Sequence, residues 1–439
     1  MKRYYLLTFG CQMNARDSEL IAGVLEQLGY GATQEPCEAD IIIVLTCCVR
    51  ESAEGRAIGR ISQLKPLKKR NPSIIIGVGG CMVQSERSRH RLMKECPHVD
   101  FFFGTRNIPE LARLIQEAAA SRCQPIVDVG CCDDKALEAI TPVRRGKVSA
   151  WVTISYGCNN FCSYCIVPYV RGPERSRDPK HIIDEVKVLA SQGYKEVTLL
   201  GQNVNSYGKD LANGWDFAKL LEEVNGVEGI KRIRFVTSHP KDVSQRLIDA
   251  MASLDKVCEH IHLPLQAGSN KVLVAMNRGY TLEHYQRLIE ALREKVPGIS
   301  ITTDLIVGFP GETEEDFSQT IRALELVRFD AAFTFMYSPR PGTGAAVLPD
   351  QVPFEVKRDR LQRVISLQKK ITLEINKLLE GKTLEVLVEG PSERDSSRLC
   401  GRTRTNKVVV FEGPSELVGD IVNVKITTAR LWSLDGEMV

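Results

Sequence analysis

The chain is most informative at residues 154–165, which read Ile154-Ser-Tyr-Gly-Cys158-Asn-Asn-Phe-Cys162-Ser-Tyr-Cys165. This loop places three cysteines within eight residues, directly after an apolar run that predicts a β-strand. A cubane iron–sulfur cluster has four iron corners, so three cysteine ligands leave one iron open to a small molecule. The spacing therefore predicts a metal centre at a strand end, with one position available for chemistry.

Two other uses of closely spaced cysteines fit this loop less well. Structural zinc prefers four protein ligands, usually from two separated pairs, and no second pair lies nearby in the sequence. A disulfide framework is typical of short secreted chains with regular cysteine spacing. This chain has 439 residues and opens without a secretory leader, so we expect its 14 cysteines to lie in a reducing cytoplasm.

Length and charge limit the remaining possibilities. A chain of this length exceeds one ordinary core and predicts two or three domains. It has no apolar stretch of about 18 residues, so we expect no membrane span. The net charge is only +3, from 58 basic and 55 acidic residues. The whole chain is therefore not a polycation, and any contact with nucleic acid must come from local patches.

The first 120 residues alternate strand and helix patterns. Strands are expected at residues 4–9, 40–45 and 73–78, and helices at 17–28 and after Arg50. Such alternation predicts a parallel sheet with helices on both faces. We therefore predict an amino-terminal α/β domain of the flavodoxin-like type over residues 1–120.

Cys11, Cys47 and Cys81 each follow one of these three strands. The carboxyl edge of a parallel sheet is its ligand-binding edge, so the three thiols are expected to converge there and to hold a second cluster. Any one of them alone could be a buried hydrophobe. Cys48 competes with Cys47, which we prefer because it comes first after the strand. We expect the other eight to be packing residues or exposed thiols: Cys37, Cys48, Cys96, Cys123, Cys131, Cys132, Cys258 and Cys400.

Beyond an irregular linker predicted at residues 121–147, a second alternation begins and extends over residues 148–376. Its six strand patterns predict a partial parallel (β/α)6 barrel, with the cysteine loop at the carboxyl end where barrel enzymes keep their active sites. The expected strands are 148–156, 197–201, 232–237, 260–265, 300–307 and 331–336.

A long charged helix at 354–380 leads into short alternating strands at 384–388, 408–411 and 421–426, which predict a small antiparallel barrel over residues 377–439. Arg402, Arg404 and Lys407, with Arg398, form a basic cluster that could hold an RNA backbone; a solvated surface is the alternative. Arg171, Arg175 and Arg177 could similarly guide phosphates toward the cysteine loop.

The CxxxCxxC spacing with an aromatic before the last cysteine resembles that of radical S-adenosylmethionine (SAM) enzymes. The resemblance implies a 4Fe-4S cluster whose open iron binds the amino and carboxyl groups of SAM, which one electron cleaves to give a 5′-deoxyadenosyl radical. Tyr164 is similar to the family residue near the adenine. Gly201, Gln202 and Asn203 replace the usual Gly-Gly-Glu motif, and their amides could hold the ends of SAM; capping a turn is the alternative.

In the order of its parts, the whole chain resembles the radical SAM methylthiotransferases: an amino-terminal cluster domain, a radical core and a TRAM RNA-binding module. The opening Thr8-Phe-Gly-Cys11-Gln-Met-Asn14 is similar to the branch that acts on transfer RNA. That branch implies two 4Fe-4S clusters, two SAM molecules and 2-methylthiolation of N6-isopentenyladenosine next to the anticodon.

The resemblance also implies partners and leaves alternatives. The expected partners are a tRNA anticodon stem-loop and a low-potential electron donor, and the expected form is a monomer. Within the same chemistry, the alternatives are methylthiolation of threonylcarbamoyladenosine in tRNA or of a ribosomal protein aspartate. A nonenzymatic iron–sulfur RNA-binding redox sensor is the alternative of a different class.

Overall fold

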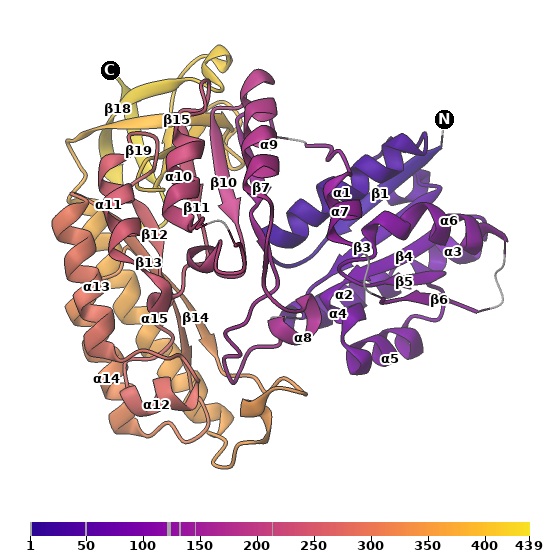
Figure 1. The fold of residues 1–439 in the computed structure, drawn as a ribbon, viewed down its shortest axis with the longest axis horizontal. Coiled ribbons are helices and arrows are strands. Elements are labelled where there is room, and N and C mark those ends of the chain that lie inside the picture. The colour runs from indigo at the N-terminus through magenta and orange to yellow at the C-terminus, as the bar shows by residue number, and fades with distance from the viewer. Residues whose placement is uncertain (1, 49–50, 121–123, 131–132, 145, 213) are drawn as a thin grey trace. The chain divides into compact units, whose positions relative to one another are not determined.

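The computed structural model describes residues 2–48, 51–120, 124–130, 133–144, 146–212 and 214–439. Cys123, Cys131 and Cys132, and the residues at 49–50, lie outside the described part. The chain forms two compact units (Figure 1). The first comprises Met1–Arg145, Gly157–Asn159 and Cys165–Glu174, and the second comprises Gly146–Tyr156, Asn160–Tyr164 and Arg175–Val439.

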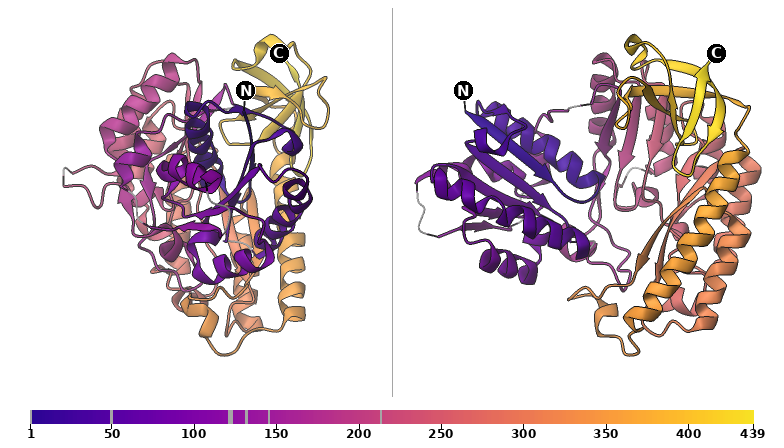
Figure 2. Two further views of the ribbon diagram at one scale, coloured as in Figure 1. Left: turned by 90° about the vertical axis from the view of Figure 1, so that its right-hand side faces the viewer. Right: turned by 180° about the vertical axis from the view of Figure 1, so that it is seen from behind.

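The first unit is built on a parallel sheet in the order β2-β1-β3-β4-β5-β6. Figures 1 and 2 show helices on both of its faces. The start of this order, 2-1-3-4-5, is that of flavodoxin-like folds and confirms the predicted fold class. The strands are β1 (Arg3–Thr8), β2 (Gly31–Ala32), β3 (Ile41–Thr46), β4 (Ile75–Gly80), β5 (Phe101–Phe103) and β6 (Ile126–Asp128). The helices are α1 (Gln12–Gln27), α2 (Glu51–Ser62), α3 (Lys65–Arg70), α4 (Cys81–Gln84), α5 (Glu86–Glu95), α6 (Leu111–Ala120), α7 (Asp134–Glu138) and α8 (Val167–Arg171).

Strand β5 was not expected from the sequence, and its neighbour β4 explains how it packs. A side chain at Gly77 would lie 2.2 Å from Cζ of Phe101, and one at Gly79 would lie 2.2 Å from Cζ of Phe103. The glycines of β4 therefore leave the space that the aromatic rings of β5 fill. Three consecutive aromatic residues are too short a pattern to predict a strand alone.

The segment at 121–147 differs from the predicted irregular linker. Residues Ile126–Asp128 form β6, which pairs with β5 and extends the first sheet. Asp128 accepts a hydrogen bond from Nδ2 of Asn107 at 2.7 Å and also pairs with Arg113. Part of the segment is thus held in the first unit, because pairing with the edge of β5 satisfies backbone groups that a loop would leave to water.

The second unit contains the partial barrel. Its parallel strands form two sheets, β11-β10-β7 and β12-β13-β14, joined by a bridge between Ile233 and Val257 and by a hydrogen bond from the Ser238 amide to the His262 carbonyl. The six predicted parallel strands of a partial barrel are confirmed, although the first, expected at 148–156, ends as β7 at Thr153. The barrel strands are β7 (Ser149–Thr153), β10 (Glu196–Leu200), β11 (Arg232–Phe235), β12 (His260–His262), β13 (Ser300–Val307) and β14 (Ala331–Met336). The short strands β8 (Ser155–Tyr156) and β9 (Arg175–Ser176) form a separate antiparallel pair. The helices are α9 (Pro179–Ser191), α10 (Phe217–Asn225), α11 (Gln245–Ser253), α12 (Asn270–Ala275), α13 (Leu282–Lys295), α14 (Glu314–Val327) and α15 (Phe354–Lys377).

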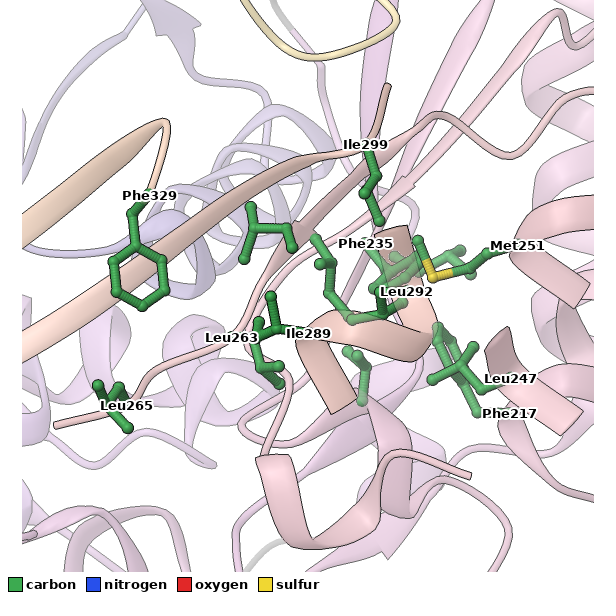
Figure 3. Packing of buried hydrophobic residues seen from close by; sticks show 14 of the residues in the cluster. Phe217, Phe235, Leu247, Met251, Leu263, Leu265, Ile289, Leu292, Ile299 and Phe329 are labelled. Carbon is green, nitrogen blue, oxygen red and sulfur yellow. The ribbon is translucent and has the colours of Figure 1, made fainter. Parts of the chain in front are cut away.

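The main core lies between these strands and the helices outside them (Figure 3). Phe217 of α10 meets Phe235 of β11 edge to face, with ring centroids 5.1 Å apart. Leu247 and Met251 of α11 and Leu292 of α13 belong to the same buried cluster. Because this packing fixes the strands, their carboxyl ends form a rigid frame for a site.

The chain ends in a closed five-stranded barrel in the order β15-β16-β17-β19-β18. Its strands are β15 (Thr383–Pro391), β16 (Leu399–Thr403), β17 (Val408–Phe411), β18 (Ile421–Ala429) and β19 (Leu434–Met438). The small barrel is confirmed, with β16 and β19 added to the expected strands. Strands β17 and β19 pair in parallel, whereas the other pairs are antiparallel.

Candidate functional site

The first unit places three predicted cysteines after neighbouring strands. Cys11 is the residue before α1, Cys47 follows β3, and Cys81 is the first residue of α4 after β4. Because β1, β3 and β4 are adjacent and parallel, all three cysteines follow the same edge of the sheet. Their role as ligands stays a prediction.

Two glycines make room at this edge. A side chain at Gly10 would lie 2.5 Å from Cβ and 3.0 Å from Sγ of Cys47, and Gly10 has φ +115°. A side chain at Gly80, where φ is +97°, would lie 2.4 Å from the carbonyl oxygen of Thr46. Glycine at both positions therefore lets the chain pass close to the Thr46–Cys47 segment.

Asn14 fixes the two loops beside the thiols. Its side chain is fully buried, and its Nδ2 donates to the Phe9 carbonyl at 2.7 Å and to the Thr46 carbonyl at 3.0 Å. The Thr46 hydroxyl in turn donates to the Gly79 carbonyl at 2.7 Å. The loops after β1 and β3 and the end of β4 are therefore tied together by buried hydrogen bonds.

Arg171 brings a buried positive charge to the same place. It donates to Oδ1 of Asn14 at 2.8 Å and to Oδ2 of Asp17 at 2.9 Å. Burial opposes its charged form, but Cys81, Asp17 and Cys11 outweigh that effect and raise the pKa of Arg171. Burial raises the pKa of Asp17, while Arg171 opposes that shift. Arg171 is therefore an ion-pair partner within the first unit, where it faces the predicted thiol set.

Cys48 lies in the apolar core of the first unit together with Cys81. The hydrogen bond between the two thiols lowers the pKa of Cys81 to about 6, and Arg171 acts in the same direction against the effect of burial. The same bond raises the pKa of Cys48 well above its usual value. The contact with Cys48 and the charge of Arg171 therefore both favour the thiolate form of Cys81, and thiolate is the form in which cysteine binds metals.

The residues of the second cysteine loop are divided between the units. Cys158 and Cys165 belong to the first unit, where the amide of Cys158 donates to the Gly172 carbonyl at 3.2 Å. Cys162 and Tyr164 belong to the second. Both accept a hydrogen bond from Nη1 of Arg278 at 3.3 Å. Sequence reasoning missed Arg278, which lies in the Met-Asn-Arg-Gly stretch after α12.

Buried polar atoms without partners gather at the carboxyl ends of the barrel strands. Asn203, for example, donates from Nδ2 to Asp242 at 2.6 Å, while its Oδ1 has no partner among the described residues. Gly201 lies close enough that a side chain there would be 2.6 Å from Oγ of Ser155. The atoms of this kind at the strand ends are Ser155 Oγ, Asn203 Oδ1, Asn205 Oδ1, Ser238 Oγ, His239 Nε2, Gln266 Oε1 and Tyr337 OH.

A buried polar atom without a partner is costly, so a group of them at one end of a barrel indicates a polar ligand. SAM, with its carboxylate, ammonium and ribose hydroxyls, fits such a surface. Burial lowers the pKa of His239 to about 2, so this ring is neutral. Its Nδ1 accepts a hydrogen bond from the Lys241 amide, which leaves Nε2 as an N–H donor. Thiols, a buried guanidinium and polar oxygens are also a donor set that fits an iron–sulfur cluster with a bound amino acid group.

Of the predicted SAM-binding residues, Asn203 carries one of these atoms and Gly201 lies against Ser155. Tyr164 accepts a hydrogen bond from Arg278. Gln202 is half-buried after β10. Sequence reasoning gave no role to Ser155, Ser238, Gln266 and Tyr337. The available signal was position, since Ser238, Gln266 and Tyr337 each follow a predicted barrel strand and Ser155 lies near the carboxyl end of the strand predicted at 148–156.

The predicted RNA-binding residues have acidic neighbours within the second unit. Arg404 donates to both carboxylate oxygens of Glu259 at 2.7–3.0 Å, and Lys407 donates to Asp330 at 2.6 Å. Nε of Arg402 lies 3.2 Å from Oε1 of Glu389. The pairs of Arg404 and Lys407 join the small barrel to the amino ends of the radical-core strands, whereas the pair of Arg402 and Glu389 lies between β16 and β15 of the small barrel itself. The contact of these residues with RNA stays a prediction. Along the described residues, no helix is both long and apolar enough to cross a membrane.

Family models match three successive parts of the chain. The Radical SAM superfamily matches residues 152–324, Uncharacterized protein family UPF0004 matches residues 3–104, and the TRAM domain matches residues 377–439.

Relatives match over nearly the whole length. The tRNA-2-methylthio-N(6)-dimethylallyladenosine synthase of Thermoanaerobacter sp. (strain X514) is 56% identical over 436 residues, which cover 99% of this chain and 92% of the relative. The enzyme of the same name from Carboxydothermus hydrogenoformans is 54% identical over 438 residues, covering 100% and 99%. That of Moorella thermoacetica is 54% identical over 438 residues, covering 100% and 98%.

Solved structures agree in fold. The radical S-adenosylmethionine methyltransferase TsrM from Kitasatospora setae, with cobalamin and a [4Fe-4S] cluster bound, matches with a TM-score of 0.56 and 16% identity, covering 79% of this chain and 77% of that one. The cobalamin-dependent S-adenosylmethionine radical enzyme OxsB matches with a TM-score of 0.52 and 13% identity, covering 84% and 56%. At these identities the likeness supports the architecture alone.

Proposed function

Because this chain belongs to the tRNA-2-methylthio-N(6)-dimethylallyladenosine synthase family, we propose that it converts N6-isopentenyladenosine in tRNA into its 2-methylthio derivative. The proposal uses SAM and two 4Fe-4S clusters. Its main support is the match over 99% of the chain, within which both predicted cysteine sets lie at strand ends.

The cysteines divide into two sets with different roles. We assign Cys158, Cys162 and Cys165 to the cluster that binds SAM. The second cluster is assigned to the set of Cys11, Cys47 and Cys81. When bound, the two clusters supply an electron for the cleavage of SAM and a site for the sulfur that is methylated and transferred.

The protein's own residues would bind and orient these groups. At the strand ends, Ser155, Asn203, Ser238 and Gln266 offer buried polar atoms to the polar parts of SAM. In the first unit, Arg171 supplies a positive charge beside thiolates, which reduces their mutual repulsion. The thiols of Cys47, Cys81, Cys158 and Cys162 are buried, whereas Cys165 is half-buried and Cys11 is exposed. Burial limits the access of solvent and stray side chains, with which a radical would react.

The finer partners form part of the same proposal. A base next to the anticodon is single-stranded and can be turned out of its stack into a pocket, which suits an anticodon stem-loop as substrate. The proposal also includes a low-potential electron donor, a monomeric enzyme and a cytoplasmic location. Arg402, Arg404 and Lys407 are proposed as RNA contacts of the small barrel.

The decisive experiment is anaerobic turnover. The reconstituted protein is given SAM, a reductant and isopentenylated tRNA, and the digested nucleosides are analysed by mass spectrometry. We expect 2-methylthio-N6-isopentenyladenosine and 5′-deoxyadenosine. Product only with threonylcarbamoyl tRNA or with a ribosomal protein would reject the proposed substrate, and absence of both products with intact clusters would favour a binding protein.

Two variants separate the roles of the cysteine sets. Cys162→Ala should abolish formation of deoxyadenosine and of the methylthio nucleoside. Cys47→Ala should retain cleavage of SAM and lose the methylthio product. Methylthiolation at the parent rate in either variant would contradict the assignment of that cysteine.

A further inference from the structure

Arg278 is a buried arginine whose nitrogens all have partners, one of which is a predicted cluster ligand. The residue is 4% exposed. Its Nη1 donates to Sγ of Cys162 at 3.3 Å and to the Tyr164 hydroxyl at 3.3 Å. Its Nη2 donates to the Pro264 carbonyl at 3.1 Å, and its Nε donates to the Tyr280 hydroxyl at 3.2 Å.

We propose that Arg278 is a positioning residue that raises the reduction potential of the cluster bound through Cys162. The inference rests on the proposed function, because it takes Cys162 as an iron ligand. It assigns to Arg278 a task beyond packing, namely an N–H···S hydrogen bond from a permanent positive charge.

The backbone around Arg278 is fixed by the end of α12. The amide of Asn277 donates to the Val274 carbonyl at 2.9 Å, and the amide of Arg278 donates to the Leu273 carbonyl at 3.0 Å. Asn277 has φ +55°. These are the two bonds and the left-handed residue of a Schellman motif, in which asparagine is the usual substitute for glycine. The position of Arg278 is therefore set by a helix end rather than by a loose loop.

The same helix end also holds the cysteine loop. Ser163, between Cys162 and Tyr164, donates its amide to the Met276 carbonyl at 3.0 Å and its hydroxyl to the Ala275 carbonyl at 2.7 Å. Nδ2 of Asn277 donates to the Phe161 carbonyl at 3.0 Å. One turn of the chain thus fixes both the sulfur and the guanidinium, so the distance between them is determined by local structure.

The charge of Arg278 is directed at the sulfur. A guanidinium stays protonated in proteins. Among the described residues, the hydrogen-bond partners of Arg278 are a thiol, two hydroxyls and a carbonyl, with no carboxylate. Arg171 differs, because it forms an ion pair with Asp17. The charge of Arg278 is therefore not neutralised by an ion-pair partner.

Reduction adds a negative charge to a cluster, so a nearby cation and an N–H···S bond favour the reduced form. Loss of Arg278 should make the cluster harder to reduce. A purely structural arginine would affect stability and iron content and would leave the potential of any cluster formed unchanged.

The test is a redox titration of full-length protein carrying Cys11→Ala, Cys47→Ala and Cys81→Ala, so that one cluster is present. The reduced cluster is followed by electron paramagnetic resonance in this parent and with Arg278→Gln, Arg278→Lys or Tyr280→Phe added. At the parent midpoint, we expect the reduced-to-oxidised ratio to fall about tenfold in Arg278→Gln and less in Arg278→Lys. Tyr280→Phe, which removes a partner of Nε and spares the sulfur contact, should stay within about twofold.

An unchanged ratio in Arg278→Gln, with the cluster intact, would overturn the inference. If Arg278→Gln binds no iron, the Arg278→Lys variant provides the test, because a lysine cannot reproduce the several hydrogen bonds of the guanidinium. A lowered reduced-to-oxidised ratio in Arg278→Lys supports the inference, and an unchanged ratio overturns it. Failure of the parent itself to form a cluster would instead reject the cysteine assignment of the proposed function, and the inference with it.

Discussion

The two ends of the partial barrel treat their polar side chains in opposite ways. At the amino ends of the strands, Arg234 of β11 donates to Glu196 of β10 at 2.7 Å and to the Thr403 carbonyl of the small barrel at 2.7 Å. Its neighbour Arg232, which is fully buried, donates from Nη1 to the Arg402 carbonyl at 2.6 Å and from Nη2 to Glu385 at 2.9 Å, although its Nε has no partner among the described residues. At the carboxyl ends, oxygens such as Ser238 Oγ and Gln266 Oε1 are buried without partners.

The difference between the two ends shows which polar groups stabilise the fold and which are available to a ligand. Groups at the amino end bind one another, and this joins the radical core to the small barrel. Groups at the carboxyl end are held in place by the strands but keep bonding capacity for a ligand. Amino-end substitutions should therefore lower stability, and carboxyl-end substitutions should lower binding.

The largest expected effect is at the buried pair of Arg234 and Glu196. Arg234→Met should lower the free energy of unfolding by about 3–5 kcal/mol, because it leaves the Glu196 carboxylate buried without its cation. Chemical denaturation measures the loss. The double variant with Glu196→Gln should recover part of it, and a single variant as stable as the parent would remove the distinction between the two ends.

Asp316 refines the comparison, because it lies near the carboxyl end and yet its carboxylate is bound by other groups of the protein. It accepts hydrogen bonds from the hydroxyls of Ser269 and Thr313, each at 2.7 Å. As the N3 residue of the capping box of α14, it also accepts one from the amide of Thr313, the N-cap residue, at 2.9 Å. Despite the opposing effect of burial, these bonds and Lys271 lower the pKa of Asp316 from 3.8 to about 2.

A lowered folded-state pKa gives stability that is present above the unfolded pKa and is lost on acidification. The contribution of Asp316, about 2 kcal/mol, should be complete above pH 5 and should disappear as the pH falls from about 4 through about 2. Asp316→Asn should be less stable than the parent at pH 6, with a smaller gap at pH 3. Urea denaturation at both pH values measures it, and a gap independent of pH would contradict the assignment.

Substitution of Arg404 tests whether the contact between the small barrel and the radical core also takes part in binding RNA. Arg404→Ala should lower the free energy of unfolding by about 1–3 kcal/mol, since it removes bonds to Glu259 and to the Val257 carbonyl. Glu259→Gln is the matched control for the ion pair. A fall in tRNA affinity in Arg404→Ala alone would support its proposed RNA contact, and equal affinity in both variants would assign it to the contact between the small barrel and the radical core.

Ser238→Ala, at the carboxyl end, should lower the binding of SAM and not the stability, and it changes the structure least. Removing a buried hydroxyl that has no partner should leave the apoprotein at least as stable as the parent. SAM should bind about tenfold more weakly, which corresponds to about 1.4 kcal/mol for one lost hydrogen bond. Equilibrium binding to the reconstituted protein measures this. An affinity for SAM equal to that of the parent, together with lowered stability, would show that Ser238 stabilises the fold, as the groups at the amino end do.

The order of the elements could be predicted from the sequence because it depends on local pattern. Alternation of apolar residues marked β1, β3 and β4 to within two residues, and Glu314–Val327 matches α14. The short strands escaped prediction. Phe101–Phe103 and Ile126–Asp128 become strands only because the neighbouring edge accepts them, and their length of three residues carries no period of its own.

The candidate site was predictable in its thiols and not in their surroundings. The spacing of Cys158, Cys162 and Cys165 and the strand-end positions of Cys11, Cys47 and Cys81 are visible in the printed sequence. Arg278 is separated from Cys162 by more than a hundred residues, and Arg171 from Asp17 likewise. No pattern along the chain relates such pairs.

By itself, the sequence determined which residues could bind metal, how strands and helices alternate, and which modules follow one another, because these depend on side-chain chemistry and on neighbours a few positions away. Only the tertiary structure decided that the basic hairpin of the small barrel meets Glu259 and Asp330, and that oxygens at the opposite strand ends stay unpaired. Pairing and burial are properties of groups brought together by packing, so they exist only once the barrel has formed.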